Sequence, residues 1–390
     1  MKSVSLSITD SLRAIPSTEW DALIGDAPLL SHAFLHALHE TGCASPETGW
    51  TPRYIVASRA GRVVGALPLY LKAHSYGEYI FDWSWADAYR RHGRRYYPKL
   101  LAAIPFTPAT GPRLISDDPA MRGALLDAAR ALMVDEGVSS LHILFPRDVE
   151  ADECATAGFM MRSSVQFHWR NAGYRDFADF LSTLNHGKRA NIRQERRKLA
   201  ARGISFRRIT GSDIGERDWR FFFRCYQNTY RDHHSTPYLS LEFFQRIGRE
   251  MPQNVLMVVG SQDGTPICAA LDVFCSGTLW GRYWGATGYI PGLHFEACYY
   301  QAIEFCIERN IALFEGGAQG GHKLARGLLP VTTRSAHLVA DRDFAAAIAR
   351  FVAVEREDVA QTVDELERAS PFRQEHGALD AAEPSASECR

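Results

Sequence analysis

The chain has 390 residues, of which 46% are hydrophobic and 23% are charged, and its formal net charge at pH 7 is −1. This length predicts two domains, and this composition is typical of a soluble globular enzyme. The near-neutral charge excludes a protein whose whole surface is adapted to nucleic acid, and DNA is not an expected partner. The start of the chain lacks the apolar core of a signal peptide, and no apolar run approaches the length of a membrane span, so we expect a cytoplasmic protein.

The cysteines are scattered along the chain. There are eight, they form no C-x-x-C pair, and most of them lie within apolar runs. This pattern favours buried free thiols in a reducing compartment over disulfides or a metal site. The sequence therefore predicts no metal ion and no tightly bound cofactor.

A faint internal repeat organises the rest of the chain. Residues 53–83 predict a strand, a turn at Gly61, a second strand and a third. Residues 254–286 repeat this order, with Gly264 in the corresponding turn. Repetition on this scale predicts two domains with the same build.

Each copy continues with an apolar-striped helix and a short apolar strand. In the first copy the helix is expected at 119–136 and the strand at 140–146. In the second copy the helix begins near His294 and the strand lies at 311–317. Consecutive strands followed by a helical crossover predict mixed sheets, and hence an α/β or α+β fold.

We place the domain boundary between the two copies. The expected N-terminal domain spans 1–165, and the C-terminal domain, with the reaction centre, spans 166–370. The polar residues 371–390 predict a disordered tail.

A basic segment opens the second domain. Between Lys188 and Arg208 the sequence holds nine Lys or Arg residues and a single acid, Glu195. A helix here would be a candidate for binding the phosphates of a donor, because guanidinium groups bind phosphate with two parallel hydrogen bonds. The candidate residues are Arg189, Arg193 and Arg196. The alternative is a solvated basic helix.

The stretch "FEGGAQGGHKLARGLLP" at 314–330 suggests a phosphate loop but does not fit one. His322 follows Gly321, and Lys323 is followed by Leu324, so the hydroxyl that a nucleotide-binding loop offers to Mg²⁺ is missing. The stretch does place a glycine turn at the end of a strand, where backbone N–H groups can point at a substrate. The alternative is a tight turn with a solvated His-Lys pair.

Three stretches carry a family resemblance: "FEGGAQGGHKLARGLLPVTTRSAH" at 314–337, "HSYGEYIFDWSWADAYRRHG" at 74–93 and "LHFEACYYQAIEF" at 293–305. They resemble the bacterial FemAB-like family of predicted N-acyltransferases, the peptidoglycan biosynthesis/recognition group, and the resemblance extends over nearly the whole chain. It implies two tandem GNAT-like acyltransferase domains, in agreement with the repeat. Family members usually carry an acid where this chain has Gly321, so another group would have to replace that acid.

Acyl transfer to an amine needs a base, a bound donor and stabilisation of the oxyanion. His322 is one candidate base, since its ordinary pKa lies near neutral pH, and Glu315 is the other, if burial raises its pKa. The alternative role for Glu315 is a salt bridge to Lys323 or Arg326. Substrate contacts in the turn are expected from Gly316, Gly317, Gln319, Gly320, Lys323 and Arg326.

The first domain offers carboxylates framed by aromatic rings. Asp82 is a third catalytic candidate, and Glu78, Trp83 and Trp85 are candidates for recognising a cationic acceptor amine. The aromatic core face of a strand would explain the same residues.

A Gly/Pro loop precedes the helix of the second copy, and such a junction can bind an anion. Gly285, Gly288 and Gly292 are therefore candidates for donor phosphates, although the Q/R-x-x-G-x-G/A form of the GNAT family is missing. The neighbouring candidates for substrate contact are Tyr283, Trp284, His294 and Glu296. The last two have an alternative role as first-turn residues of the helix.

The sequence thus predicts an N-acyltransferase. Its donor would bear phosphate, as acyl-CoA, acyl carrier protein and aminoacyl-tRNA do, and its acceptor would be an amine on a small molecule, a lipid or a cell-envelope precursor. The alternative function is a non-catalytic recognition module, in which degenerate GNAT domains bind a muropeptide or a lipid headgroup.

Overall fold

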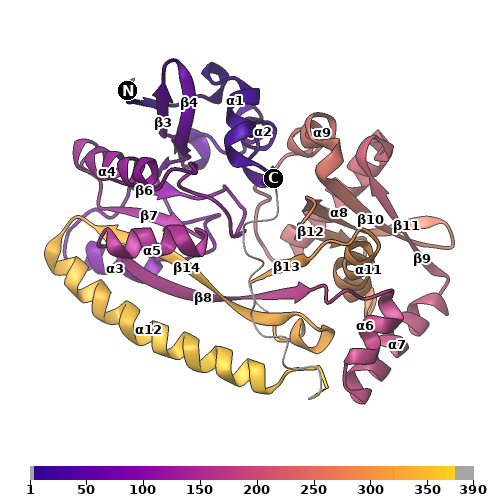
Figure 1. Cartoon of the computed structure of the whole chain (residues 1–390). Helices are drawn as coiled ribbons and strands as arrows, with labels where there is room; N and C mark the ends of the chain where they lie inside the picture. Colours follow the sequence, from indigo (N-terminus) through magenta and orange to yellow (C-terminus); the bar gives the residue numbers. More distant parts are fainter. Residues whose placement is uncertain (1–3, 319, 374–390) are drawn as a thin grey trace.

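The computed structural model describes residues 4–318 and 320–373. Its central feature is one mixed sheet of eleven strands that runs through both halves of the molecule (Figure 1). The strands follow the order β2-β5-β6-β7-β14-β8-β13-β12-β11-β10-β9 across this sheet. A separate sheet of three strands has the order β1-β3-β4.

The first half of the chain forms these elements, in chain order: β1 (Val4–Thr9), α1 (Ser17–Ile24), α2 (His32–Glu40), β2 (Trp50–Pro52), β3 (Tyr54–Arg59), β4 (Arg62–Leu67), β5 (Tyr70–Lys72), α3 (Trp83–Arg91), β6 (Lys99–Ala102), α4 (Pro119–Asp135), β7 (Ser140–Leu144) and α5 (Asp148–Thr156).

The second half continues with these elements: β8 (Met160–Arg170), α6 (Phe177–Thr183), α7 (His186–Ala200), β9 (Ile204–Thr210), α8 (Glu216–Asp232), α9 (Leu241–Glu250), β10 (Val255–Gln262), β11 (Thr265–Phe274), β12 (Thr278–Ala286), α10 (Leu293–Phe295), a π-helical turn (Glu296–Tyr300), α11 (Gln301–Glu308), β13 (Leu313–Ala318), β14 (Leu329–Val339) and α12 (Arg342–Arg368).

The two predicted hairpin turns have the same conformation. Gly61 follows Ala60 between β3 and β4, and Gly264 follows Asp263 between β10 and β11. All four residues have positive φ, from 47° to 81°. Two residues with positive φ form the tight turn that suits the twist of a β-hairpin, and glycine adopts this conformation without strain.

The strands of the two copies pair differently. In the second half β10, β11 and β12 are neighbours in the large sheet, as a strand-turn-strand pattern predicts. In the first half β3 and β4 join β1 in the separate sheet, while β5 pairs with β2 and β6. β5 is only three residues long, and it does not pair with β4. The first copy therefore keeps the order of its strands but not their single sheet.

Two long strands connect the halves. β8 pairs with β14 over nine residues, and it also pairs with β13 of the second half. β14 comes after the second copy in the sequence, yet its far end pairs with β7 of the first half. The expected boundary at 165/166 lies inside β8, in the middle of this pairing.

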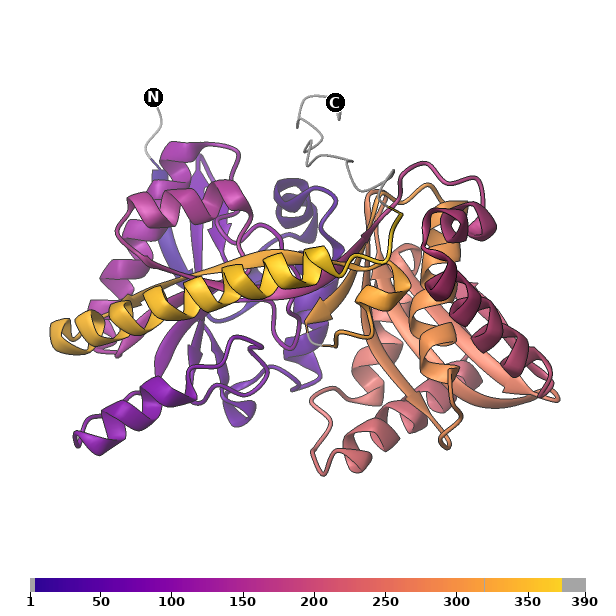
Figure 2. The same ribbon diagram turned by 90° about the horizontal axis from the view of Figure 1, so that it is seen from below.

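Helix α12 runs along the strands that join the halves (Figure 2). Its residues Ile348 and Val352 are buried in a cluster with Trp85 and Tyr89 of α3. The guanidinium group of Arg162 on β8 donates to the carboxylate of Glu355, with Nε to Oε2 at 2.6 Å. The helix therefore covers one face of β8 and β14 and holds α3 against the first half.

The end of the described chain is ordered. The backbone N–H of Asn185 donates to the carbonyl of Pro371 at 2.8 Å, and that of Arg373 donates to the carbonyl of Thr183 at 3.0 Å. These bonds attach residues 371–373 to the end of α6, whereas the sequence predicts disorder from 371 onward. The remainder of the expected tail, 374–390, lies outside the described residues.

Among the described residues, seven cysteines are free thiols, and all but Cys298 are buried. Free buried thiols match the expectation from their apolar surroundings. In the part of the chain that the structure describes, no helix has the length and apolarity that crossing a bilayer requires.

Candidate functional site

The site begins where two strands of the second half separate. β12 and β13 are parallel neighbours only where Thr278–Trp280 faces Leu313–Glu315. Beyond this point β12 follows β11, and β13 follows β8. The residues next to the divergence line a cavity of about 330 Å3, which is a size that binds small molecules.

The cavity is mostly aromatic. Its lining rings come from α8, β12, the π-helical turn and β13, with one ring from the first half: Tyr79, Tyr226, Tyr230, Tyr283, Trp284, Tyr299 and Phe314. The polar groups among them are the side chains of Thr229, Asp272, Arg282, His294, Cys298 and Lys323. An aromatic wall with a few convergent polar groups is the usual composition of a ligand site.

Among the residues that the structure describes, Asp272 is the only carboxylate that lines the cavity. It lies on β11, it is buried, and its Oδ2 has no hydrogen-bond partner among the described residues. Burial raises the pKa of this carboxyl group to about 8, and a hydrogen bond from the backbone of Arg282 opposes the shift. A buried carboxyl oxygen without a partner indicates a place for a donor from a ligand.

Arg282 fixes the first half against the cavity. Its guanidinium group donates to the backbone carbonyl of Phe106 and lies 3.4 Å from Oγ1 of Thr107. Tyr79, which comes from the same half, has positive φ and lines the cavity. The wall of the cavity is therefore completed by the other half of the molecule.

Lys323 lies on the glycine turn and reaches back into it. Its Nζ donates to the backbone carbonyls of Gly317 at 3.2 Å and Ala318 at 3.0 Å. Burial lowers the pKa of this amine to about 8. Lys323 thus links the two ends of the turn by hydrogen bonds, and its buried amine lines the cavity.

Glycines allow the turn to take this shape. Gly317 and Gly320 have φ of +76° and +100°, in the region that favours glycine. A side chain on Gly316 would meet Leu328 at 2.4 Å, so this position is closely packed. Gln319, which the sequence places in the substrate contact, lies outside the described residues.

Glu315 is buried but does not line the cavity. Its neighbours Phe314 and Gly316 do, and successive strand residues point to opposite faces of a sheet. Burial raises the pKa of the Glu315 carboxyl group to about 8, against the lowering effect of the nearby backbone of Thr110 and side chain of Trp280. Its Oε2 has no partner among the described residues. The sequence made Glu315 a candidate base only if burial raises its pKa, and the pKa is raised.

His322 is exposed next to the cavity wall. Its Nε2 lies 3.2 Å from the hydroxyl of Tyr299, and its ring is 6.1 Å from that of His294. Burial and the nearby Arg326 lower the pKa of His322. Burial lowers the pKa of His294 to about 4, so His294 is neutral at pH 7 and lines the cavity beside Trp284.

The rest of the turn is anchored to α7. Arg326 forms an ion pair with Glu195 at 2.8 Å, stacks on the ring of Phe295 and donates to the carbonyl of His322. Tyr300 donates to the same carboxylate. The single acid of the basic segment therefore holds the turn, and Lys323 and Arg326 have partners other than Glu315.

The predicted phosphate-binding arginines lie elsewhere. Arg193 and Arg196 line an open groove of about 860 Å3 between α6, α7 and α11, which shares no lining residue with the cavity. Arg196 is already paired with Glu296 at 2.9 Å and Glu304 at 2.7 Å. Arg189, one turn before Arg193, is half-buried. A role in donor binding stays a prediction for all three.

The predicted phosphate-binding glycines have different surroundings. A side chain on Gly285 would lie 1.9 Å from the carbonyl oxygen of Cys225, so this glycine allows α8 to pack on β12. Gly292 has φ of +86° and begins α10, whereas Gly288 has open space around it. Their binding of phosphate stays a prediction, and Gly288 is the position with room for it.

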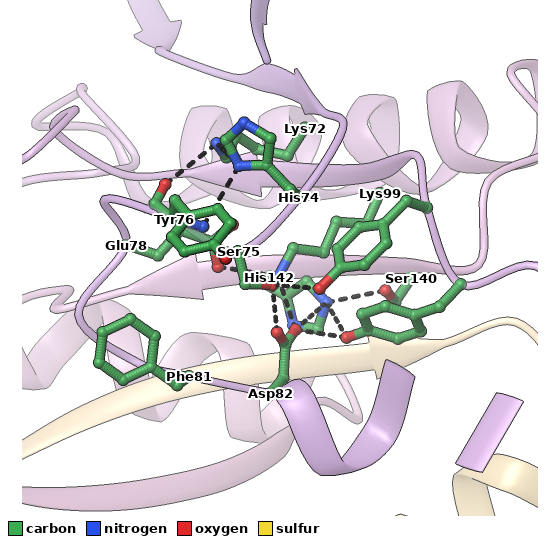
Figure 3. A network of polar contacts seen from close by, with 12 residues as sticks. Lys72, His74, Ser75, Tyr76, Glu78, Phe81, Asp82, Lys99, Ser140 and His142 are labelled. Atoms are coloured by element: carbon green, nitrogen blue, oxygen red, sulfur yellow. Dashed lines mark hydrogen bonds and ion pairs between the residues drawn. The ribbon is translucent and has the colours of Figure 1, made fainter. Parts of the chain in front are cut away.

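The candidates of the first half form a buried polar network (Figure 3). The ammonium group of Lys99 pairs with Glu78 at 2.8 Å and with Asp82, and Ser75 and Tyr96 also donate to Asp82. Burial raises the pKa of Glu78 to about 7. For Asp82, burial acts upward, but Lys99 outweighs it and keeps the pKa of that carboxyl group low.

This network extends into β14. His142 on β7 lies 3.8 Å from Asp82, and its Nδ1 is 2.6 Å from Nδ1 of His337. Trp85 packs against His337, while Trp83 is exposed. Asp82 is therefore bound within the core of the first half, and neither it nor Glu78 lines the cavity; their catalytic or binding roles stay predictions.

The structure thus brings together only part of the predicted site. The predicted residues that line the cavity are Tyr283, Trp284, His294, Gly316 and Lys323. Sequence reasoning missed Asp272, Arg282 and Tyr79. Asp272 had a usable signal in the sequence, because it is the only acid in the apolar strand "ICAALDVF". Burying an unpaired charge costs free energy, so an acid in such a place is a candidate functional residue.

Comparisons with known proteins agree with this architecture. Residues 11–374 match the model of the FemAB-like family, described as peptidoglycan biosynthesis/recognition. The solved structure of FemX is similar with a TM-score of 0.55 at 11% identity, covering 86% of this chain and 98% of that one. The C-terminal domain of a protein named for lysylphosphatidylglycerol synthetase, from Agrobacterium fabrum, has a TM-score of 0.52 at 12% identity, covering 87% and 95%.

A third structure, L-PGS from Bacillus licheniformis, has a TM-score of 0.51 at 11% identity and covers 87% of this chain and 97% of that one. No curated protein matches the chain. At such low identity these likenesses show the fold. They confirm the predicted fold class, mixed α/β sheets in two tandem GNAT-like domains.

Proposed function

This chain belongs to the FemAB-like family, and we propose that it is a transferase that passes an aminoacyl or acyl group to an amine. The reacting groups meet in the cavity beside β12 and β13. The family and the transferase-like fold support the class of reaction, and the chemistry of the cavity supports the location.

The unpaired carboxyl oxygen of Asp272 is the observation that carries the proposal. An ammonium or amine N–H would complete its hydrogen bonding, and the surrounding rings would stabilise the cation through their faces. One terminal nitrogen of Arg282 is bound to the first half, and the charge of this guanidinium group lowers the pKa of Asp272 less than burial raises it. The cavity therefore suits a substrate with an amino group.

In the transfer step, the neutral amine attacks the carbonyl carbon of the donor ester or thioester. A C–N bond forms, and the C–O or C–S bond to the donor breaks. Asp272 takes the proton that the ammonium must lose, since a base with a pKa near the working pH is effective. This first proton leaves to solvent, and the nitrogen of the tetrahedral intermediate then loses a second proton, which passes to the leaving oxygen or sulfur.

Lys323 is placed to stabilise the oxyanion of the tetrahedral intermediate. Its ammonium group lines the cavity and is held by two carbonyls of the turn. A fixed positive charge in a site with little water lowers the energy of a developing negative charge. His322, which contacts the wall residue Tyr299, can exchange protons between the cavity and solvent.

The donor remains a choice among phosphate-bearing carriers, namely aminoacyl-tRNA, acyl-CoA and acyl carrier protein. One structural relative is named for lysylphosphatidylglycerol, a lysyl ester, and this name supports an aminoacyl group. The acceptor is an amine on a cell-envelope precursor, a lipid or a small molecule, in keeping with the family description.

The alternative, a recognition module without turnover, has one specific observation in its favour. Gly285 is occupied in packing against α8, and the usual pyrophosphate motif of GNAT enzymes is missing from this loop. A protein of this kind would bind an amine in the cavity and leave it unchanged.

The two functions are separated by a transfer assay. The purified protein is incubated with each donor class and a mixture of amine acceptors, and mass spectrometry detects new amides. Transfer from one donor class, with a rise in melting temperature on adding that donor, is the expected result; saturation at about 100 times the dissociation constant adds about 2.7 kcal/mol. Stabilisation by an amine without amide formation from any donor would establish the recognition module.

A further inference from the structure

Three aromatic side chains are exposed together on the first half, around the start of α3. Tyr76 is 56% exposed, Phe81 is 44% exposed and Trp83 is 38% exposed. They contact one another, with ring centroids 4.9 Å apart for Tyr76 and Trp83 and 6.0 Å apart for Phe81 and Trp83. Grouped exposed aromatics indicate an interaction surface more strongly than the same rings scattered singly.

A cluster of arginines follows at the other end of α3. Residues 90–95, "RRHGRR", are all exposed and contain four arginines. Arg90 pairs with Asp87, and Arg94 pairs with Asp341. Within residues 4–318 and 320–373, no ion pair involves the other two, Arg91 and Arg95.

The packing of α3 decides which face points outward. Trp85 and Tyr89 are buried, and the ring of Tyr89 stacks on Phe344 of α12 at 3.9 Å. Trp83 at the start of α3 and Arg91 at its end are both exposed, and so is Arg95 just after the helix, so all three lie away from this packing. Figure 2 shows α3 as a purple helix at the margin of the first half, and Figure 3 shows Phe81 apart from the buried network.

This surface continues toward the cavity through aromatic contacts. The backbone N–H of Phe106 donates to the carbonyl of Gly77, which follows Tyr76, at 3.1 Å, and the ring of Phe106 stacks on that of Tyr238 at 4.9 Å. The ring of Tyr238 lies 5.9 Å from that of Tyr230, which lines the cavity. The segment that carries Tyr76 is therefore connected by packing to the wall that Tyr230 contributes.

We propose that this aromatic–arginine surface, made of Tyr76, Phe81, Trp83, Arg91 and Arg95, docks the protein on an anionic lipid bilayer. Indole and phenol rings are favoured at the boundary between headgroups and acyl chains. Arginines beside them attract the negative surface potential of anionic lipids. Binding by this combination is peripheral and reversible.

A lipid surface fits these residues better than nucleic acid does. Base stacking uses free aromatic faces, and the stacking of Phe81 on Trp83, with an angle of 16° between their planes, covers one face of each ring. Rings packed in this way form one apolar wedge beside the charges. Such an arrangement is stabilised at the interface between water and lipid. Docking would bring the cavity near amines held in the membrane, yet it does not depend on the proposed transfer reaction.

Vesicle sedimentation tests the proposal with the full-length protein. The probes are phosphatidylcholine vesicles with and without phosphatidylglycerol. The wild-type protein is expected to sediment with the anionic vesicles, to sediment weakly with the neutral ones, and to be released as ionic strength rises. Equal partition into both kinds of vesicle, or none into either, would overturn the proposal.

Two pairs of substitutions locate the surface. R91E/R95E should lower partition into anionic vesicles by roughly tenfold or more, because each arginine near an anionic surface contributes about a fivefold gain in binding. The matched control is R59E/R62E in the hairpin of β3 and β4, which makes the same change in net charge on exposed residues that have no predicted binding role. Equal loss in the control would show binding through general charge and would contradict the proposed surface.

The aromatic contribution is tested with F81A/W83A. Partition should fall by roughly tenfold even at low ionic strength, where the arginines still act, because peripheral binding scales with the buried apolar area. The variant's far-UV spectrum and melting temperature are measured alongside, and Phe81→Leu with Trp83→Phe should restore part of the binding if a folded apolar surface is what matters. Undiminished vesicle binding by folded F81A/W83A, or a gel shift of duplex or single-stranded RNA that R91E/R95E abolishes while vesicles do not bind, would contradict docking on lipid.

Discussion

At the scale of single residues, position on the strand separates a buried acid that can act in the cavity from one that cannot. Asp272 and Glu315 are both buried, and both have a carboxyl pKa raised to about 8. Only Asp272 lines the cavity, because Glu315 follows Phe314 on the strand and points to the opposite face. Similar electrostatics therefore accompany different positions, and position decides which acid can reach a substrate.

The first prediction concerns Asp272→Asn. If Asp272 accepts the proton of the amine, kcat should fall roughly 10²–10⁴-fold, with little loss of melting temperature. A base must be deprotonated, so the wild-type rate should rise with pH up to about 8 and then level off, and this rise should disappear in the variant. The control is Asp263→Asn in the exposed turn between β10 and β11. An unchanged pH profile in Asp272→Asn would exclude this role.

The second prediction concerns Glu315→Gln. The folded-state pKa of Glu315 lies above its ordinary value, so its contribution to stability is fully present below about pH 4.5 and is lost as the pH rises toward 8. Glutamine does not ionise, so the Glu315→Gln variant does not lose stability in this way as the pH rises. Its melting temperature relative to wild type should therefore increase between pH 5 and about 8, while kcat stays within roughly threefold.

Melting curves at several pH values check this prediction, with exposed Glu357→Gln on α12 as the control that should track wild type. A large loss of kcat in Glu315→Gln, with a normal melting curve, would instead assign the base to Glu315. That result would restore the role that the sequence suggested for this residue.

At the scale of elements, the separation of β12 from β13 depends on how α8 sits on the sheet. The hydroxyl of Thr229 donates to the carbonyl of Trp284 at 2.7 Å, and Asn228 donates to that of Ala286 at 2.9 Å. These bonds occupy the end of β12 that β13 has left. Helix α8 thus replaces the missing strand and carries Tyr226 and Tyr230 to the cavity wall.

The third prediction tests this contact with a matched pair. Gly285→Ala should destabilise the protein by about 1–3 kcal/mol or more, because its methyl group would overlap the backbone of α8 at Cys225. Gly288→Ala meets nothing within 4 Å and should leave stability nearly unchanged. Urea unfolding measures both. If Gly288→Ala is stable but raises the KM for the donor, this supports the predicted binding of phosphate at the loop.

At the scale of the whole molecule, the two halves do not close their sheets separately. β14 supplies the strand between β7 and β8, and α12 covers α3. The pair His142 and His337 joins β7 to β14 inside the buried network. The first half therefore uses a segment that is synthesised after the second half.

The fourth prediction follows for fragments. Residues 1–165 alone should not give a cooperative melting transition, because β7 would be left as an open edge and Trp85 and Tyr89 would lose the cover of α12. Co-expression of 1–165 with a 329–373 fragment should restore soluble, folded material. A sharp thermal transition of 1–165 by itself would show that the N-terminal half folds independently.

The sequence by itself determined the order of the elements, the two copies, the tight hairpin turns and the α/β class. These features depend on local patterns, such as glycine after a strand and apolar residues at helical spacing, so they can be read from neighbouring residues. It also pointed to the glycine turn, since Gly316 and Lys323 do line the cavity. Strand pairing in the first half escaped it, because pairing joins segments that are distant in the chain.

Only the tertiary structure decided which charged residues are available. Arg196, a predicted ligand for phosphate, and Arg326, a predicted substrate contact, are paired with acids from other segments: Glu296, Glu304 and Glu195. The apolar run around Asp272 marks it as an unusual acid, but only the packing leaves its Oδ2 without a partner among the described residues. Whether a charged side chain is paired or remains available to a ligand depends on the groups that pack against it. Those groups are brought together by the sheet that both halves share.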